Sequence, residues 1–503
     1  MSLARIFSRA QIGVQAPEVI VEVHLGNGLP AFHIVGLPET SVKEAKDRVR
    51  SALENSQFGF PDQRITVNLA PADLPKEGGR FDLAIAVGIL VASGQISCPD
   101  IHRYEFYGEL ALNGEVRGVN AILPSVLGAK EKGRCCFLPA DNDSLASLVS
   151  GVARKAVYSI QDVWNDLLNQ QPLPLNIEYP EQELDRESLL DLSDVKGQPG
   201  AKRVLEIAAA GGHNLLFLGP PGTGKSMLAQ RMPTIMPAMS DDEAISTAAL
   251  YSIIGQSVDL ANWRERPFRN PHHTCSAVAL VGGSSNPKPG EISLAHNGVL
   301  FLDELPEFER KVLDSLREPM ETGVVTISRA ARQMEFPSQF QLIAALNPSP
   351  TGSHTDKRAT PDQVLRYLSR VSGPFIDRID LQIELPRLTS SQLQSTEIEE
   401  SSEQVRSRVE RAYAIQLERQ GKVNARLNNK EMNRYCILAA AELQFLAKAS
   451  EKLALSPRSY HRVIKVARTI SDLKAQPNIT LSELKEALNY RAFERLISQL
   501  TQL

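Results

Sequence analysis

The sequence predicts an α/β protein with three structured parts: an N-terminal α/β domain, a central parallel β-sheet and an all-α C-terminal part. Short β-rich runs alternate with helical segments over residues 1–165. Bare apolar runs at 214–218, 299–302 and 340–346 suit the strands of a parallel sheet that is covered on both faces. Because 503 residues are too many for one hydrophobic core, we expect several domains.

The N-terminal part contains both kinds of element. Strands are expected at 19–25 and 64–69, and helices at 41–55, 81–92 and 123–132. This mixture indicates an α/β domain in its own right.

Domain boundaries are expected where the composition becomes polar or proline-rich. The predicted parts are an N-terminal domain (1–170), a linker (171–193), a central core (194–387), a polar bridge (388–402) and a helical C-terminal part (403–503). Helical spacing in the last part predicts helices over 406–420, 430–453, 458–472 and 482–499.

The charge is unevenly distributed. The whole chain has 55 Lys and Arg against 59 Asp and Glu, a net charge of −4 that by itself predicts no binding of polyanions. Residues 401–503 carry 18 Lys and Arg against 10 Asp and Glu, which gives +8 there and −12 on the first 400 residues. A basic surface is therefore expected only locally.

Cysteine spacing and hydropathy indicate the compartment. The five cysteines form no CxxC pair, which is typical of reduced intracellular thiols. The longest nearly apolar stretch, 83–94, has about 12 residues, whereas a membrane span needs roughly 20. The first residues contain no apolar signal region. We expect a cytoplasmic protein that does not enter a membrane.

A phosphate-binding loop follows the run at 214–218 and leads into a helix. It reads Gly219-Pro220-Pro221-Gly222-Thr223-Gly224-Lys225-Ser226. The glycines let backbone N–H groups close around phosphates, which also face the N-terminus of the helix. Lys225 would reach the β- and γ-phosphates, and the Ser226 hydroxyl would bind Mg²⁺. The expected cofactors are therefore ATP and Mg²⁺.

Polar side chains follow the other two apolar runs. Asp303 and Glu304 come directly after 299–302, and Asn347 follows 340–346. Asp303 fits a second group that holds Mg²⁺, and Glu304 fits the residue that orients the attacking water. Asn347 is placed at a strand end where it could sense the γ-phosphate.

Long motifs resemble the magnesium-chelatase-like AAA+ ATPases, and in particular their ComM type, over essentially the whole chain. The similar segments are 194–198, 219–226, 289–308 and 372–380. This resemblance implies an AAA+ α/β core, a helical lid, a homo-hexameric ring and ATP sites shared between neighbouring subunits. Carried onto this sequence, Asn347 resembles the sensor-1 residue and Arg458 the sensor-2 arginine. Arg378 resembles the arginine finger supplied in trans, with Arg370 as the alternative.

Two segments of the core could touch a polymer. About 70 residues separate the helix after the phosphate-binding loop from Asp303, and in the family a helix-2 insert sits here. Residues 322–336 resemble the pre-sensor-1 β-hairpin. Lys288, Arg329 and Arg332 are therefore candidate contacts to DNA phosphates, although each could instead be an ordinary solvated charge.

A histidine-rich segment lies in the same stretch. His272, His273 and Cys275 have no fourth ligand nearby with zinc-like spacing, so we expect them to be part of a loop and not a metal site.

The N-terminal domain resembles the proteolytic domain of Lon proteases over 76–82, 108–119 and 129–142. Such a protease needs a serine nucleophile and a lysine that takes its proton. This chain has Gly79-Arg80-Phe81 where the serine is expected and Leu123-Pro124 where the lysine is expected. We therefore expect no proteolysis, but a collar that stabilises a ring or guides DNA.

The function implied by the resemblance is an ATP-dependent hexameric DNA motor. It would be a helicase or branch-migration translocase in homologous recombination during natural transformation, with single-stranded or branched DNA and recombination proteins as partners. The alternative is a magnesium-chelatase-type ATPase subunit that remodels a protein partner for metal insertion. The Lon-like domain and the absence of an integrin-type docking segment favour the DNA motor.

Overall fold

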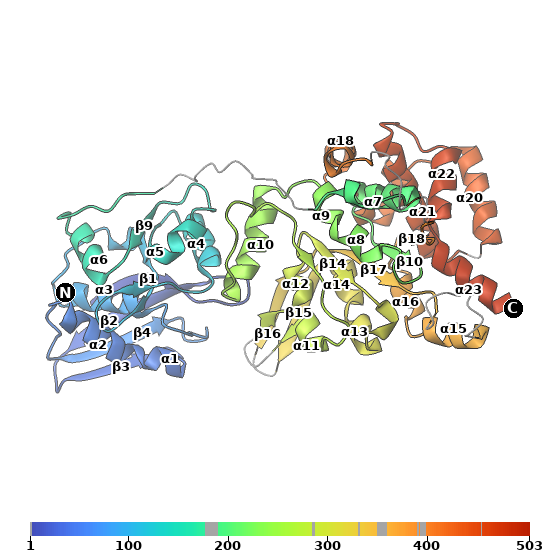
Figure 1. The fold of residues 1–503 in the computed structure, drawn as a ribbon. Helices are drawn as coiled ribbons and strands as arrows, with labels where there is room; N and C mark the ends of the chain where they lie inside the picture. The colour runs from blue at the N-terminus through green and yellow to red at the C-terminus, as the bar shows by residue number, and fades with distance from the viewer. Residues whose placement is uncertain are drawn as a thin grey trace. The chain divides into compact units, whose positions relative to one another are not determined.

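The computed structural model describes residues 3–176, 190–283, 287–329, 332–349, 360–389, 392, 399–453 and 455–502. The middle of the predicted linker and most of the predicted polar bridge lie outside these residues. The chain forms two compact units (Figure 1). The first comprises Met1–Asp185, Asp241–Trp263 and Ser328–Glu335, and the second comprises Arg186–Ser240, Arg264–Ile327 and Phe336–Leu503. Within the described residues, no helix has the length and apolar character to cross a membrane.

A seven-stranded mixed sheet forms the centre of the first unit, with strand order β3-β4-β2-β1-β5-β8-β9. Its strands are β1 (Leu3–Arg9), β2 (Glu18–Gly26), β3 (Ala31–Val35), β4 (Arg64–Ala70), β5 (Tyr104–Phe106), β8 (Cys135–Pro139) and β9 (Arg154–Val157). Strands β1, β2 and β4 pair antiparallel, whereas β1, β5, β8 and β9 pair parallel.

Helix α3 (Asp82–Ala92) packs on β1 and β2 and is buried along almost its whole length. A Cβ at Gly88 would lie 2.5 Å from Cγ2 of Val23, so glycine is needed for this close approach. The remaining elements of this part are α1 (Thr40–Lys43), α2 (Ala45–Asn55), η1 (Ile101–Arg103), β6 (Glu109–Leu110), β7 (Val116–Arg117), α4 (Ile122–Glu131), α5 (Ala140–Ala146) and α6 (Ile160–Leu167).

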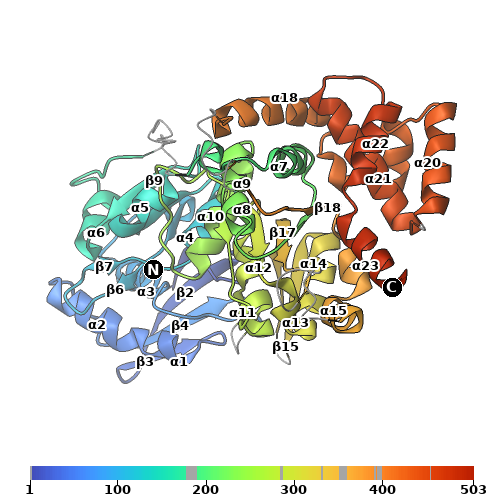
Figure 2. The same ribbon diagram turned by 45° about the vertical axis from the view of Figure 1, so that its right-hand side comes forward.

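One helix of the first unit comes from much later in the sequence. Helix α10 (Asp241–Ile253) packs against α4, and the two lie side by side in Figures 1 and 2. The Ala121 N–H, at the start of α4, donates to the Ser252 carbonyl at 2.9 Å. The predicted N-terminal domain, 1–170, does not contain this helix, which falls within the predicted core range of 194–387. The predicted domain boundaries remain a proposal.

The second unit contains a five-stranded parallel sheet, in the order β11-β14-β17-β10-β18. Its strands are β10 (Leu215–Leu218), β11 (Phe268–Arg269), β14 (Val299–Leu302), β17 (Gln341–Leu346) and β18 (Leu381–Glu384). The three predicted apolar runs are β10, β14 and β17, which are completely buried. Parallel pairing of β17 with both β10 and β14 brings the carboxyl ends of these strands to one edge of the sheet.

The other elements between Leu192 and Ile376 are short helices and two strand pairs, of which the second pair includes Ser328–Glu335 of the first unit. They are η2 (Leu192–Asp194), α7 (Pro199–Gly211), α8 (Lys225–Gln230), α9 (Met232–Ile235), α11 (Ala277–Val281), α12 (Glu291–Leu294), η3 (Leu305–Glu307), α13 (Arg310–Ser315), α14 (Arg317–Thr322), α15 (Pro361–Leu368), α16 (Gly373–Ile376), and the strand pairs β12 (Gly282–Gly283) with β13 (Lys288–Pro289) and β15 (Val324–Arg329) with β16 (Arg332–Pro337).

The C-terminal part is helical, as predicted, and lies beside α7 (Figure 2). It consists of α18 (Ser402–Gln420), η4 (Asn424–Arg426), α19 (Asn429–Tyr435), α20 (Ala440–Lys452), α21 (Pro457–Leu473), α22 (Leu481–Asn489) and α23 (Ala492–Gln502).

The predicted helices 430–453 and 482–499 are each divided in two. The first breaks at Cys436, whose ψ of 53° is not helical. The second breaks at Tyr490 because its carbonyl accepts a hydrogen bond from Gln382 N–H at 2.9 Å, as the chain pairs with β18.

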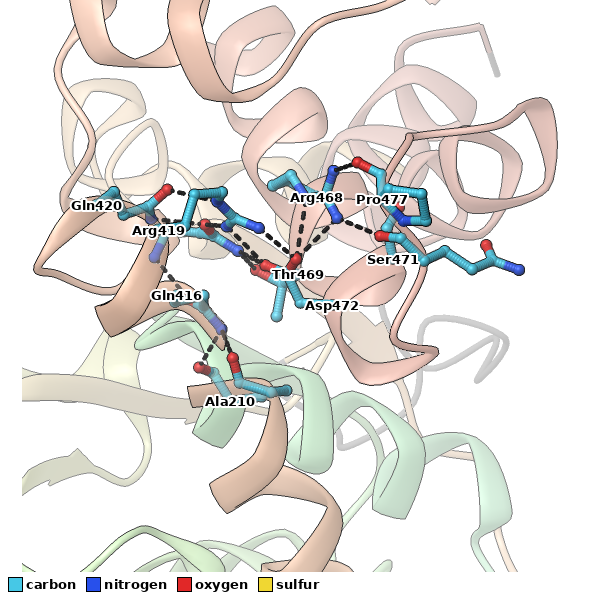
Figure 3. A network of polar contacts seen from close by, with 12 residues as sticks. Ala210, Gln416, Arg419, Gln420, Arg468, Thr469, Ser471, Asp472 and Pro477 are labelled. Carbon is cyan, nitrogen blue, oxygen red and sulfur yellow. Dashed lines mark hydrogen bonds and ion pairs between the residues drawn. The ribbon is translucent and has the colours of Figure 1, made fainter. Parts of the chain in front are cut away.

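A buried polar network joins the C-terminal helices to the core (Figure 3). The Asp472 carboxylate accepts hydrogen bonds from Arg419 at 2.6 and 2.9 Å and from Arg468 at 2.8 and 3.0 Å. Gln416 donates to the Ala210 carbonyl on α7 at 2.9 Å. Because an unpaired buried carboxylate would cost several kcal/mol, these contacts favour one fixed packing of α18, α21 and α7.

Candidate nucleotide site

The loop between β10 and α8 has the backbone conformation that its glycines permit. Gly222 and Gly224 have φ angles of 78° and 88°, in the left-handed region that favours glycine. Gly219 is required for a different reason, because a Cβ there would lie 2.8 Å from the Leu385 carbonyl oxygen. The Thr223 hydroxyl donates to the Pro220 carbonyl at 2.9 Å and closes the turn.

The Lys225 ammonium group lies over this loop. It donates to the carbonyls of Gly219 at 2.7 Å and Pro220 at 3.0 Å, and to Asn347 Oδ1 at 3.0 Å. Burial lowers the pKa of Lys225, and the charges of Asp303 and Glu304 act in the opposite direction. The structure thus brings the predicted phosphate-binding lysine and the predicted sensor-1 asparagine into direct contact.

Ser226 and Asp303 also meet. The Ser226 hydroxyl donates to Asp303 Oδ2 at 2.6 Å, and the Glu304 N–H donates to Asp303 Oδ1 at 2.9 Å. Hydroxyl and carboxylate oxygens are the ligands that Mg²⁺ prefers, usually together with phosphate oxygens and water. This donor set beside the loop fits a Mg²⁺-bound nucleoside triphosphate.

Glu304 has an unusual backbone conformation. It follows β14 with φ 53° and ψ 46°, the left-handed region that is unfavourable for a residue other than glycine. Strain of this kind is concentrated at functional sites. Its side chain is 53% exposed, and Oε2 lies 3.2 Å from Nδ1 of His273.

Glu304 faces a cleft of about 610 Å³. His273, Asn347, Arg366 and Arg370 line the same cleft. Arg370, the alternative finger, lies 3.4 Å from Glu307 in an exposed ion pair. Arg366 is not among the residues predicted from the sequence, and His273 was expected only as part of a loop. His273 belongs to a Pro-His-His run shortly after β11. The run could not be assigned to the site from the sequence, because its position there depends on the pairing of β11 with β14.

The other two predicted arginines meet at Glu321 on α14. Nη2 of Arg378 lies 2.8 Å from Glu321 Oε1, and Nη2 of Arg458 lies 3.4 Å from the same oxygen. Arg378 also donates to the carbonyls of Arg317 at 3.2 Å and Pro374 at 2.7 Å, and only 12% of its side chain is exposed. The Arg458 side chain is 56% exposed. In this chain both arginines therefore contact Glu321 rather than the loop at 219–226.

The predicted DNA contacts are only partly described. Lys288 is exposed in the short hairpin β12–β13. Arg329 and Arg332 end the facing strands of β15 and β16, but their side chains lie outside the described part of the structure.

In the Lon-like region of the first unit, the places predicted to match the protease serine and lysine are buried. Arg80 is buried and donates to the Asn120 carbonyl at 3.1 Å, the Ala121 carbonyl at 3.4 Å and the Ser125 hydroxyl at 3.3 Å. Burial lowers the pKa of Arg80 to about 10. At the places predicted to match the Lon serine and lysine, the chain thus has a buried arginine and the buried Leu123.

Comparison with known proteins agrees with these features. Three family models match: "Magnesium chelatase, subunit ChlI" over residues 191–393, "Subunit ChlI of Mg-chelatase" over 21–142 and "Magnesium chelatase, subunit ChlI C-terminal" over 399–491. The chain is 54% identical to Competence protein ComM of Haemophilus influenzae and 48% identical to the protein YifB of Escherichia coli, in both cases over 100% of each chain. It is also 26% identical to Lon protease 2 of Bacillus subtilis over 145 residues, which cover 28% of this chain and 26% of that protein.

Proposed function

The chain belongs to the magnesium-chelatase ChlI family of AAA+ ATPases, and from this membership we propose that it is an ATP-dependent hexameric DNA motor. The motor would be a helicase or branch-migration translocase in homologous recombination during natural transformation. The observation that supports ATP hydrolysis is the convergence of Lys225, Ser226 and Asp303 at one edge of the sheet.

The residues of this edge can share the work of hydrolysis. Lys225 and the N–H groups of the loop bind and orient the phosphates, and Ser226 with Asp303 would hold Mg²⁺, which supplies positive charge beside them. Glu304 orients the attacking water and takes its proton, because its carboxylate faces the cleft from a fixed backbone position. Asn347, which contacts Lys225, responds to the γ-phosphate.

Sharing of the ATP site between subunits is supported by the position of the two arginines. Arg378 and Arg458 converge on Glu321, so one neighbouring site can receive both once that carboxylate is exchanged for phosphate. Arg370 lines the cleft of its own chain, which favours Arg378 as the finger. Mixing Arg378→Ala subunits with Glu304→Gln subunits should leave active only interfaces that pair an intact Glu304 with an intact Arg378. Full ATPase activity of a dilute monomer would contradict a shared site.

Action on DNA is supported by local basic charge and by the name of the full-length relative, a competence protein. Lys288 is exposed, and residues 401–503 carry a net charge of +8 on a chain of −4. The family description, magnesium chelatase, favours the second candidate, a subunit that remodels a protein partner. ATP hydrolysis by such a subunit should be stimulated by its partner protein and should not change when DNA is added.

The deciding experiment measures ATP hydrolysis with and without single-stranded DNA and four-way junctions, over a range of salt concentrations. We expect DNA to stimulate hydrolysis, and the stimulation to fall steeply with salt. Arg329→Ala with Arg332→Ala should remove the stimulation and leave the basal rate, and Glu304→Gln should stop turnover but retain ATP binding. Arg50→Ala, which removes an exposed arginine on α2, is the matched control. If DNA has no effect at any salt concentration, the motor proposal fails and the remodelling candidate takes its place.

A further inference from the structure

The first unit contains a cavity of its own, which the proposed function does not use. Its volume is about 450 Å³, within the range of about 300–1,000 Å³ that is usual for small-ligand sites. It lies where three parallel strands begin, because Tyr104 of β5, Cys135 of β8 and Lys155 of β9 line it. The end of α4 and the segment after α6 complete its wall.

Every charged side chain that lines this cavity is positive. The four cations are Arg103, Lys130, Arg134 and Lys155. A concave site lined by charge of one sign focuses the electric field and raises the local concentration of ions of the opposite sign. The cavity is therefore suited to an anionic ligand.

Carboxylates that do not line the cavity balance two of these cations. Nζ of Lys155 lies 2.6 Å from Asp166, whose side chain is 2% exposed. Nη1 of Arg134 lies 3.1 Å from the completely buried Glu105, and it also pairs with Glu18. These pairs fix two cationic groups in the wall, so that little ordering is needed there when an anion binds.

The other two cations are available to a ligand. Among the described residues, the Lys130 ammonium group has no ion-pair or hydrogen-bond partner. Arg103 makes only a loose ion pair, in which Nε lies 3.6 Å from Asp100 and 69% of the Arg103 side chain is exposed. Because an exposed pair of this kind contributes little free energy, the Arg103 guanidinium can turn towards an anion at small cost.

Two backbone N–H groups add to these donors. Gly151 and Val152 line the cavity, and their N–H groups donate to no other residue in the described part of the chain. Gly151 has a φ angle of 73°, in the left-handed region that favours glycine. Successive N–H groups in such a turn can form a concave site for the oxygens of an anion. Together with Lys and Arg side chains, they are groups that bind phosphate.

An apolar wall adjoins the donors. Leu173 and Leu175 line the cavity, and Leu175 is 51% exposed. Two backbone hydrogen bonds of 3.0 Å between Asn176 and Arg154 fasten this segment to β9. The Leu173 N–H also donates to Asp166 of α6 at 2.7 Å. The cavity thus fits an anion that carries an apolar body, as in a nucleotide, whose phosphate is joined to a sugar and a flat base.

We propose that this cavity binds the phosphate group of a nucleotide, with the rest of the nucleotide against Leu173 and Leu175. Lys130 and Arg103 hold the phosphate oxygens, and the fixed cations of the wall add positive charge. Two sources carry this chemistry, a free mononucleotide and a nucleotide within a DNA strand. The site uses none of the residues of the candidate ATP site, so its failure would leave the proposed function untouched.

The thiol of Cys135 provides the readout, because this side chain lines the cavity. Burial raises the pKa of Cys135 to about 11, so its alkylation by iodoacetamide is slow enough to be timed. The experiment measures the alkylation rate in the full-length protein at rising concentrations of AMP or of a single-stranded oligonucleotide. Mass spectrometry separates Cys135 from the other cysteines, and thermal unfolding checks that each variant is folded.

We expect AMP to slow the alkylation of Cys135 in a saturable manner, also in Lys225→Ala, whose ATP site is weakened. Arg103→Ala combined with Lys130→Ala should raise the half-protecting concentration by about 10-fold or more, because two charged contacts to phosphate are lost. Lys132→Ala is the matched control, since this exposed lysine is close to Lys130 in the sequence but does not line the cavity. It should change that concentration by less than about 2-fold.

The two probes distinguish the sources. Protection by the oligonucleotide at a lower concentration than AMP would assign the site to a DNA strand, since a polymer makes further phosphate contacts. Protection by AMP at the lower concentration would assign it to a free nucleotide. The proposal is overturned if neither probe slows alkylation, if protection is lost in Lys225→Ala, or if the double variant is protected as well as the original protein.

Discussion

Two glycine-containing loops in this protein each lead into a helix and each carry a buried cationic side chain, but only one of them lies beside an open cleft. Before α3, Arg80 is buried and donates to backbone carbonyls and a hydroxyl of its own unit. At the start of α8, Lys225 lies beside Asn347, and Asn347 and Glu304 line an open cleft. Both cations bond to groups of the fold, but only the second lies beside residues that line a cleft able to admit a ligand.

This difference shows why resemblance in fold does not transfer activity. The first unit is similar in sequence to part of a Lon protease, yet its interior has an arginine and a leucine at the places predicted to match the serine and lysine. Chemistry depends on the site rather than on the fold. The two loops can be compared directly by substitutions that act on one unit and spare the other.

The largest effect is expected from Lys225→Ala. Removing a partly buried ammonium group that binds phosphate should weaken ATP binding roughly 100-fold or more, because the phosphate charge then loses its main partner. A titration with a fluorescent ATP analogue measures this, and thermal unfolding without nucleotide should change little. Unchanged analogue binding would contradict the assigned role of the loop.

Arg80→Ala should do the reverse, affecting stability and leaving ATP binding intact. It removes a large buried side chain and leaves the carbonyls of Asn120 and Ala121 without this donor, so we expect a loss of about 3 kcal/mol in the free energy of unfolding of the first unit. Among the described residues, Nε and Nη1 of Arg80 have no hydrogen-bond partner. Arg80→Met, which fills the same space, should therefore cost only about 1 kcal/mol. Chemical denaturation measures the free energy of unfolding of both variants. Equal losses in Arg80→Ala and Arg80→Met would contradict the prediction that filling the space restores most of the stability.

The two units should also respond to pH in opposite directions. Burial raises the pKa of Asp82 from 3.8 to about 6, despite its contact with Arg48. Burial alone would also raise the pKa of Asp380, but the contact with His213 and the charge of Arg462 lower it to about 2. Asp82 therefore contributes stability below pH 3.8 that is lost as the pH rises through 6, whereas Asp380 contributes stability above pH 3.8 that is lost as the pH falls towards 2.

Amide hydrogen exchange of α3 and of β18 measures this contrast. From pH 4 to 6.5 we expect the protection of α3, corrected for intrinsic exchange rates, to fall by up to roughly 2–3 kcal/mol while β18 changes little. In Asp82→Asn the decline in α3 should disappear, since asparagine resembles the protonated carboxyl group. A decline that persists in Asp82→Asn would assign it to another group.

The smallest effect is expected at Lys288. As a single exposed phosphate contact, its change to Ala should weaken DNA binding less than 10-fold and reduce the slope of log K against log salt by about 1. Fluorescence anisotropy at several salt concentrations measures both quantities. An unchanged slope would show that Lys288 does not contact phosphate.

The site was predictable where its signal is local. Strand, glycine loop and helix follow one another within 214–231, and the Asp303-Glu304 pair directly follows its strand, so each could be recognised without knowledge of the fold. Parallel pairing of β10, β14 and β17 then brings these local signals together.

What the sequence did not reveal depends on distant contacts. The contact between His273 and Glu304 requires β11, a strand of two residues that is too short to give a periodic signal. The meeting of Arg378 and Arg458 at Glu321 brings together three segments that are distant in the sequence. The helix break at Tyr490 has the same origin, because it is caused by pairing with β18 and not by a local breaker.

The discontinuous first unit has a consequence for synthesis on the ribosome. Helix α4 emerges with the N-terminal part of the chain, but α10, which packs on it, begins only at Asp241. Until then the face of α4 that α10 covers is exposed to the translation machinery and to chaperones. Fragments that stop at Asp185 should share this exposed face permanently and be prone to aggregate. The first unit is thus completed only after Asp241–Trp263 and Ser328–Glu335 have been translated.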